Sequence, residues 1–255
     1  MDEVNLFDYA FCGTADVFAK AIANLAAIAE DENWSFDGRP YSVLYNYIKG
    51  TFRQCYVQGK VLVSDDGEYS CFNTGLLTKH GNDIVGFFAK NKYEDVQDWY
   101  LVSFRDVSDR QFLNAFDCVP EIATYTDNYE ELYFNPNYPL ILNIDHILDD
   151  NWERISDVVP MSKRVVHKLI ESAVADAKKQ VRRNVRLAVP QYYNNKISYL
   201  LPLRIPLEDS DDTVVMALAI ELTAKKHYRA NTIYTKEMAY ECARLIMRPE
   251  SNWLM

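Results

Sequence analysis

The spacing of apolar residues changes abruptly at Lys60, and this change constrains the fold more than any other feature. Residues 14–30 and 43–57 carry apolar side chains at helical intervals. From Lys60 onward, the runs "KVLVSDDGEYSCFNTGLLT", "NDIVGFFAKN" and "DWYLVSFRD" are typical of strands joined by short turns. Such short connections allow antiparallel neighbours only. The sequence therefore predicts an α+β fold in which antiparallel β-meanders or sheets pack with helices.

Two helices are predicted before this change. Thr14 is a suitable N-cap for the first, and the second begins near Val43. The apolar positions expected to face the core are Val17, Ile22, Leu25 and Ile28 in the first helix, and Leu44, Tyr47, Ile48 and Phe52 in the second.

The second half repeats both kinds of pattern. A short helix is expected to begin at Ser108, the proline-rich stretch 120–160 reads as irregular apart from "LILNIDHILDDNWERI", and Ser162 precedes a long helix. A hairpin with its turn at Asn194 and Asn195, the acidic loop "EDSDD" and the strand "TVVMALAIEL" follow. Because no Gly/Ser linker interrupts the chain, we expect a single α+β domain, 1–255. This domain can be divided into two lobes, about 1–160 and 161–255, which we do not expect to fold independently.

Charge and composition limit the function classes. The net charge of -10 opposes indiscriminate binding to nucleic acid or to anionic membranes. Five cysteines without a CxxC pair are typical of reduced, buried thiols. The N-terminal residues lack a signal-peptide pattern, and no apolar run approaches the roughly 20 residues of a membrane span. We expect a cytoplasmic protein that does not enter membranes.

The long helix after Ser162 is predicted to be amphipathic and basic. Its apolar positions fall on one face when projected at the helical period, and its cations collect on the other. A cationic face suits the phosphates of RNA or of a nucleotide. The alternative is a solvated face that pairs with the abundant carboxylates of the chain. The cations concerned are Arg164, Lys168, Lys178, Lys179, Arg182, Arg183 and Arg186.

A second helix is predicted after Thr235, with Tyr240, Arg244 and Arg248 on one face at intervals of four residues. Arginines at this spacing repel unless an anion lies between them. That anion is either a ligand phosphate or carboxylate, or the neighbouring Glu241. The buried stripe of this helix is expected to be Met238, Cys242, Leu245 and Ile246.

Asn73, Thr74 and Gly75 interrupt a strand-like run. Glycine inside a strand often marks a β-bulge or a close approach of the backbone to a ligand. Asn73 and Thr74 would then offer hydrogen bonds to a ligand. A plain transition from strand to turn explains the same residues.

His146 is the candidate for acid/base chemistry, because carboxylates flank it in "NIDHILDDNWERI". There is no HExxH motif and no second histidine at helical spacing, so no metal site is predicted. The GxSxG, P-loop and GxGxxG motifs are also absent, and no cofactor can be named.

Three blocks, "FNTGLLT…DIVGFFAKN", "DHILDDNWERI" and "YRANTIYTKEMAYECARLIMRPESNWL", resemble an uncharacterised bacterial family known only as a domain of unknown function. The resemblance covers about Phe11 to Leu254. Glu237 and Glu241 stand where the family pattern has aspartate and asparagine. The family's association with cold-shock or LOTUS-type modules implies work on RNA or nucleotides. The motif positions here are Asn73, Thr74, Gly75, His146, Asn151, Arg154, Tyr228, Arg229, Thr232, Tyr240, Arg244, Arg248 and Trp253.

These observations lead to two hypotheses. The first is an RNA- or nucleotide-directed domain with an arginine-lined phosphate site, extended to a phosphoester-processing enzyme if His146 acts as acid or base. The alternative is a non-catalytic interaction or regulatory protein that forms a homo-oligomer or binds an RNA-processing partner. The residues expected to hold substrate or phosphate are Asn73, Thr74, Arg154, Arg229, Tyr240, Arg244 and Arg248.

Overall fold

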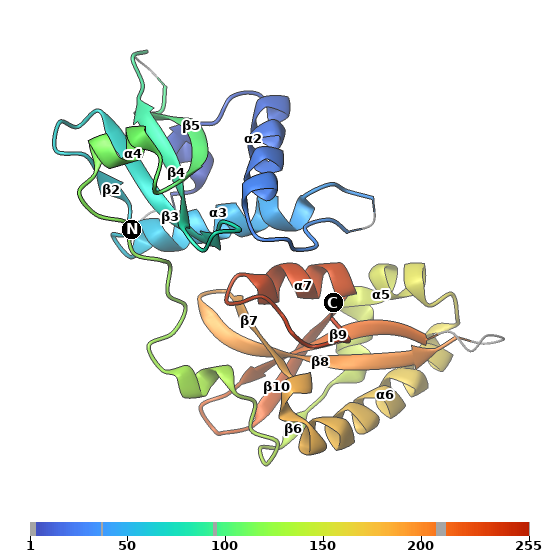
Figure 1. Ribbon diagram of the computed structural model, residues 1–255. Coiled ribbons are helices and arrows are strands. Elements are labelled where there is room, and N and C mark those ends of the chain that lie inside the picture. The colour runs from blue at the N-terminus through green and yellow to red at the C-terminus, as the bar shows by residue number, and fades with distance from the viewer. Residues whose placement is uncertain (1–3, 37, 94–95, 208–212, 255) are drawn as a thin grey trace. The chain divides into compact units, whose positions relative to one another are not determined.

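The computed structural model describes residues 4–36, 38–93, 96–207 and 213–254, and the chain divides into two compact units, Met1–Thr124 and Tyr125–Met255. Each unit contains one five-stranded sheet with helices packed against it, which confirms the predicted α+β class (Figure 1). The predicted acidic loop "EDSDD", residues 208–212, lies outside the described residues. None of the helices in the described ranges has the length and apolar character needed to traverse a bilayer.

The first unit follows the predicted order of elements. Its helices are α1 (Leu6–Tyr9), α2 (Ala15–Ile28), α3 (Ser42–Val57) and α4 (Arg110–Ala115). Its strands are β1 (Ala10–Phe11), β2 (Leu62–Val63), β3 (Tyr69–Leu77), β4 (Asp83–Lys90) and β5 (Trp99–Asp106). Thr14 caps α2 as expected, by accepting a hydrogen bond from the backbone of Val17. The cap of α4 is Asp109 and not Ser108, because the Asp109 carboxylate accepts from two backbone N–H groups.

The strand order of the first sheet is β1-β5-β4-β3-β2. Strands β2 to β5 form the predicted antiparallel meander, whereas the two-residue strand β1 adds to the edge in parallel orientation. Phe72 and Phe88 on one face of the sheet contact Phe52 of α3. Phe87 on the other face contacts Phe116, which follows α4. The sheet is therefore covered by aromatic side chains on both faces.

The predicted core positions of α3 are buried, but two of those in α2 are not. Val17 and Ile28 are 54% and 38% exposed, whereas Phe18, Ile22 and Leu25 are buried. The apolar stripe of this alanine-rich helix is therefore rotated toward Phe18. Alanines on several sides of the helix left its orientation undetermined by the sequence.

A β-bulge occurs at Gly75, where the φ angle is +70°. The Asn73 side chain accepts a hydrogen bond from the Gly75 N–H at 2.9 Å, and the Thr74 hydroxyl donates to the Ile84 carbonyl at 2.6 Å. The Tyr47 hydroxyl donates to the Thr74 carbonyl at 2.8 Å. The predicted strand interruption is thus a bulge whose irregular backbone is satisfied by neighbouring side chains.

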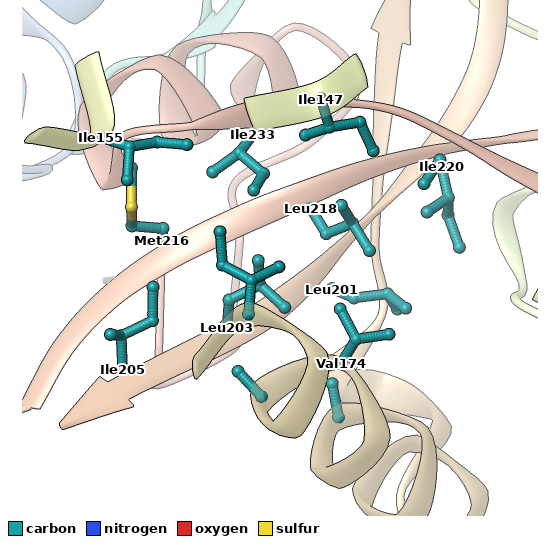
Figure 2. Close-up of a cluster of buried hydrophobic side chains, with 14 of the residues drawn as sticks. Ile147, Ile155, Val174, Leu201, Leu203, Ile205, Met216, Leu218, Ile220 and Ile233 are labelled. Carbon is teal, nitrogen blue, oxygen red and sulfur yellow. The ribbon is translucent and has the colours of Figure 1, made fainter. Parts of the chain in front are cut away.

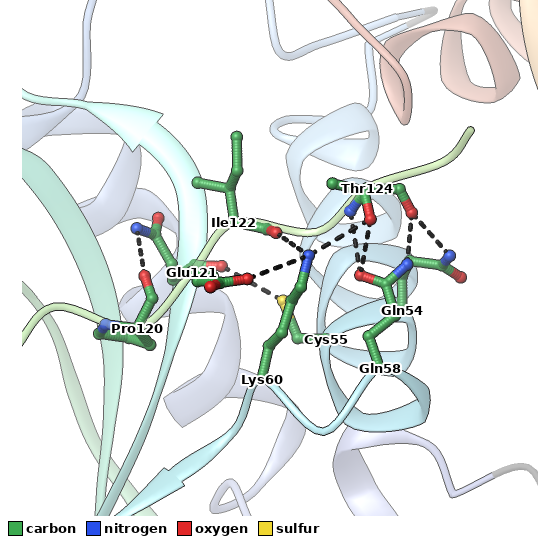
Figure 3. Close-up of polar contacts among 9 residues, drawn as sticks. Gln54, Cys55, Gln58, Lys60, Pro120, Glu121, Ile122 and Thr124 are labelled. Atoms are coloured by element: carbon green, nitrogen blue, oxygen red, sulfur yellow. Dashed lines mark hydrogen bonds and ion pairs between the residues drawn. The ribbon is translucent and has the colours of Figure 1, made fainter. Parts of the chain in front are cut away.

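The segment that ends the first unit is held by hydrogen bonds to its backbone (Figure 3). Lys60 Nζ donates to the Ile122 carbonyl at 2.8 Å, and Gln54 donates to the Thr124 carbonyl at 2.8 Å. Gln58 accepts from the Thr124 N–H at 3.0 Å. The last residues of the unit are thereby fixed against α3 and the turn that follows it.

The second unit contains a long helix, as predicted. Its helices are η1 (Tyr129–Leu132, 3-10), α5 (Ile144–Val158), α6 (Lys163–Arg183), η2 (Val185–Leu187, 3-10) and α7 (Lys236–Arg244). Its strands are β6 (Leu140–Ile141), β7 (Val189–Tyr193), β8 (Lys196–Pro206), β9 (Thr213–Leu222) and β10 (Tyr228–Tyr234). Asn194 and Asn195 form the predicted turn between β7 and β8, with φ angles of 49° and 59° that match a two-residue hairpin.

The second sheet has the order β6-β10-β9-β8-β7, antiparallel except where the short β6 adds beside β10. Alternate residues of β8 and β9, including Leu201, Leu203 and Leu218, point to one face and pack with Val174 of α6 and Ile147 of α5 (Figure 2). Because α5 contributes to this core, it belongs to the second unit. The division between units lies at 124/125, whereas the expected lobes met near residue 160. That the two parts do not fold independently stays a prediction.

The bulge gives the first prediction. We expect Gly75→Ala to lower the free energy of unfolding by about 2–3 kcal/mol. The left-handed conformation costs about 1–2 kcal/mol with a Cβ, and the displaced Tyr47 hydroxyl costs about 1 kcal/mol more. The added Cβ would lie 2.8 Å from the Tyr47 hydroxyl oxygen. Gly67→Ala is the matched control, because its φ is +72° and a Cβ would meet nothing within 4 Å. Equal losses in urea unfolding would contradict the role of Tyr47.

Buried thiols give the second prediction. Burial raises the pKa of Cys12 and Cys55 to about 12 and of Cys242 to about 11, from 9.0. The folded chain therefore keeps protons that the unfolded chain releases. This contribution to stability is complete below about pH 9 and is lost as the pH rises from there toward the folded-state values. We expect the free energy of unfolding to fall by up to about 1.4 kcal/mol per pH unit for each thiol.

Urea unfolding between pH 8 and pH 10.5 measures this slope. Cys55→Ala should reduce it, whereas Cys118→Ser should leave it unchanged because Cys118 is exposed. A stability that does not depend on pH in this range would contradict the prediction.

Candidate functional site

The outer face of α6 carries the basic surface that the sequence predicted. Val166, Ile170, Ala177 and Val181 are buried at helical spacing, which fixes the rotation of the helix. The cations on the opposite side are exposed, and Arg186 extends the row into η2. These residues are Arg164, Lys168, Lys178, Lys179, Arg182, Arg183 and Arg186.

Most of these cations have no carboxylate partner among the described residues. In the part of the chain that the structure describes, Lys179 is the one member of the row with an ion pair, to Asp176 at 3.1 Å. Arg183 donates to the Lys179 carbonyl at 2.9 Å, which satisfies the last turn of the helix but neutralises no charge. The alternative in which this face pairs with the carboxylates of the chain therefore holds for Lys179 alone among the described contacts.

A groove of about 550 Å³ lies between α5 and the start of α6. We call it the N-terminal groove. Three cations and two carboxylates line it, so its formal charge with neutral histidine is 3 - 2 = +1. Lys163 bonds to Asp149, and this hydrogen bond is the main reason that the pKa of Asp149 lies below its usual value. The lining residues are Asp145, Leu148, Asp149, Lys163, Arg164, His167 and Lys168.

A second groove, of about 210 Å³, lies along the later turns of α6. We call it the C-terminal groove. One wall is aromatic and proline-rich, with Phe134 stacked on Tyr228 at 4.6 Å and Tyr138 at its edge. Lys178 and Arg182 form the other wall at a spacing of four residues, where like charges repel unless an anion lies between them. An apolar wall opposite two cations suits a flat ligand that carries negative charge.

Asn73 and Thr74, predicted to contact a ligand, belong to the first unit and are 2% and 0% exposed. The Asn73 amide also donates to the Asp83 carboxylate and to the Pro120 carbonyl, both at 3.0 Å. The Asn73 side-chain oxygen accepts from the Gly75 N–H, so both the amide and the oxygen of this side chain are hydrogen-bonded within the first unit. Both residues stabilise the bulge in this structure.

His146 lies on the exposed side of α5 and faces Asp150 at 3.4 Å. It lines none of the grooves described above. His167 is the histidine that lines the N-terminal groove. Its Nε2 lies 3.2 Å from the Asp145 carboxylate, and its Nδ1 lies 3.7 Å from the Glu171 carboxylate. The sequence signal for His167 was the carboxylate four residues later, which His146 shares, so the sequence could not separate them.

Arg154 connects α5 to the second sheet. Its guanidinium donates to the Ile233 carbonyl at 2.7 Å and to the Asn151 side-chain oxygen at 3.1 Å. The same oxygen accepts from the Thr232 hydroxyl at 2.6 Å, and the Asn151 amide donates to the Ile147 carbonyl. These family-motif positions therefore meet in space, but they bond to one another beside the irregular register of β10.

Arg229 lies on β10 with its side chain 60% exposed, 3.6 Å from the Glu221 carboxylate. Its Nε also donates to the Asn231 side-chain oxygen at 3.3 Å. Arg229 is thus on the surface, and a ligand would compete with one weak ion pair and one long hydrogen bond.

The arrangement predicted for the C-terminal helix is wrong in two respects. Tyr240 and Arg244 lie on the buried side, 4% and 8% exposed, whereas the expected stripe of Met238, Cys242, Leu245 and Ile246 is half-buried. The helix ends at Arg244, so the exposed Arg248 is not part of it. Residues 245–248 turn instead of continuing the helix before Pro249.

In the described ranges, no group of three histidine, cysteine or acidic side chains is arranged to hold a metal ion. The fold and these surfaces define a two-sheet α+β protein whose basic helix is flanked by grooves. The family model described as "Domain of unknown function (DUF3825)" matches residues 25–253, and the chain belongs to this family. Searches of the curated proteins and of the solved structures found no match.

The contrast between the two β10-associated arginines is testable. We expect Arg154→Ala to lower the free energy of unfolding by about 1–3 kcal/mol, because it leaves the Ile233 carbonyl and the Asn151 oxygen with fewer donors. Arg229→Ala is the control and should change it by no more than about 0.5 kcal/mol. Chemical unfolding of both variants gives the two values, and similar losses would refute a structural role specific to Arg154.

Proposed function

We propose that this protein binds single-stranded RNA through the outer face of α6. The observation that carries the proposal is the row of seven exposed cations, of which all but Lys179 lack a carboxylate partner among the described residues. Four of the seven line a groove, two near each end of the helix. Arg164 and Arg182 are separated by about 27 Å along the helix axis, at about 1.5 Å per residue. This length suits several consecutive phosphates rather than one small anion.

The C-terminal groove favours a single strand over a duplex. Proteins that bind single strands combine cations for the backbone with aromatic surfaces for the bases. Tyr138 and the prolines beside it supply such a surface within the groove that contains Lys178 and Arg182. A paired duplex conceals its base faces and gains nothing from this wall.

The net charge of -10 limits where on the protein surface RNA can bind. An acidic protein repels nucleic acid except where a local cationic surface reverses the field. Binding along α6 would therefore be confined to that face. The association of the family with cold-shock and LOTUS-type modules, expected from the resemblance, points the same way. A cytoplasmic location is part of the same proposal.

The proposal is one of binding. Hydrolysis of a phosphoester would require an acid or base beside the bound phosphate, and His167 in the N-terminal groove is better situated for this than His146. A homo-oligomer or a bound RNA-processing partner is the competing function. It predicts no RNA affinity even at low salt.

Fluorescence anisotropy with a labelled single-stranded RNA tests the proposal. Lys178→Ala/Arg182→Ala should weaken binding and reduce the slope of log affinity against log salt by about 1.4, since each phosphate contact to a single strand contributes about 0.7.

Lys20→Ala/Lys79→Ala is the control, because it removes the same charge from the first unit. It should leave the slope unchanged. No binding at low salt, or equal effects of the two double variants, would refute the proposal.

A further inference from the structure

A small polar pocket of about 90 Å³ lies on the second sheet. Its lining includes Gln191, Ser198 and Ala219. Ser198 and Ala219 alternate along their strands with Tyr199 and Leu218, which belong to the core shared with α5 and α6. Because successive residues of a strand point to opposite faces, the pocket lies on the face of the sheet away from α6. It is therefore separate from the grooves described above.

Gln191 is the unusual residue of this pocket. It is 1% exposed, and its side-chain oxygen has no hydrogen-bond partner among the described residues. Buried amides are normally bonded, because an unsatisfied acceptor is costly in free energy. The hairpin register places Gln191 directly opposite Ser198, and the Asn194–Asn195 turn fixes that register. The side-chain oxygen of Gln191 is thus buried at a fixed position in the sheet without a partner among the described residues.

The chemistry around Gln191 is mostly neutral. Ser198, Asn231 and Tyr234 contribute hydroxyl and amide groups, and burial raises the pKa of Tyr234 to about 12, so its hydroxyl stays protonated at neutral pH. Tyr193 is 54% exposed at the edge of the pocket. Its ring offers a surface on which a flat heterocycle can stack.

Cations surround the one carboxylate of the pocket. Glu221 lies 3.6 Å from Arg229 and 4.0 Å from Lys196, and both cations are well exposed. The formal charge of this group is 2 - 1 = +1. A cationic ligand is disfavoured because Glu221 already has two cationic neighbours. An anion whose neutral part hydrogen-bonds to an amide matches the site better.

We propose that this pocket binds a nucleotide, with the Gln191 amide bonded to the edge of the base and the phosphate held by Arg229 and Lys196. An amide offers a donor and an acceptor side by side, which is the pattern that a base edge complements. The volume equals that of about three water molecules, so the edge of the base enters and the rest of the ring stacks on Tyr193. This site is independent of RNA binding along α6.

Isothermal titration calorimetry with adenosine monophosphate and uridine monophosphate tests the site, with a short oligonucleotide as a third probe. A free nucleotide and the terminal nucleotide of an RNA share the same chemistry. The titrations use Lys178→Ala/Arg182→Ala, so that binding along α6 does not contribute. Binding of the monophosphates then identifies the first source, and binding of the oligonucleotide alone identifies the second.

Gln191→Leu should weaken binding of the effective probe about tenfold or more, because hydrogen bonds to the base are lost. The melting temperature should stay unchanged or rise, since the substitution removes an unsatisfied buried acceptor. Gln97→Leu is the matched control. Its amide donates to the Phe7 carbonyl at 2.9 Å, so this variant should lose stability and keep binding.

Three results would overturn the proposal. They are no heat of binding with any probe at millimolar concentration, unchanged affinity in Gln191→Leu, and a melting temperature for Gln191→Leu that falls as it does for Gln97→Leu. Loss of RNA binding in Lys178→Ala/Arg182→Ala leaves this site intact, so the two proposals fail separately.

Discussion

The burial of one side of α6 against β8 and β9 is the interaction on which the rest of the second unit depends. Val166, Ile170 and Val174 are at most 3% exposed and belong to one cluster with aliphatic residues of the sheet. Figure 2 shows Val174 beside Leu201. Once these side chains point inward, the rotation of a helix of 21 residues is fixed, and its cations must point outward. The same sheet face receives α5, so the groove beside His167 is a consequence of two helices that share one core. The packing of α6 on the sheet is therefore sufficient to keep the cations on the outer face of the helix.

The elements with strong periodicity could be predicted from the sequence, because burial acts on every third or fourth residue of a helix and on every second residue of a strand. Turns with special backbone needs were equally visible, as Asn194 and Asn195 show. The boundary between the units was not. The segment that ends at Thr124 is held by Lys60, Gln54 and Gln58 through backbone carbonyl and N–H groups, and every residue type except proline supplies both. A boundary of this kind has no compositional signature.

The candidate site divides along the same line. The cationic face of α6 was predicted because charge on a helix is periodic, whereas the sequence did not show that polar residues of the family motif bond within their own unit. Asn73 and Arg154 bond to carbonyls and side chains of their own unit, at a bulge and at a helix–strand contact. A side chain that satisfies an irregular backbone is of the same type as one that binds a ligand. Only the hydrogen-bond partners distinguish the two roles, and the partners are known only from the three-dimensional structure. Gln191 shows the converse, since a single glutamine in a strand forms no pattern.

The two kinds of unpartnered group differ in what they imply. An exposed cation without a carboxylate loses little, because surface ion pairs contribute about 0–1 kcal/mol. The evidence for a binding surface on α6 is therefore the number of exposed cations and their alignment along the helix, and not any one residue. A buried amide without a partner costs about 1–3 kcal/mol, which is a large part of a typical net stability. Leucine would fill the same space at Gln191 without that cost. The amide at this position therefore lowers the stability of the folded chain, and stability alone does not explain why it is there. A ligand that bonds to the amide would offset this cost in free energy.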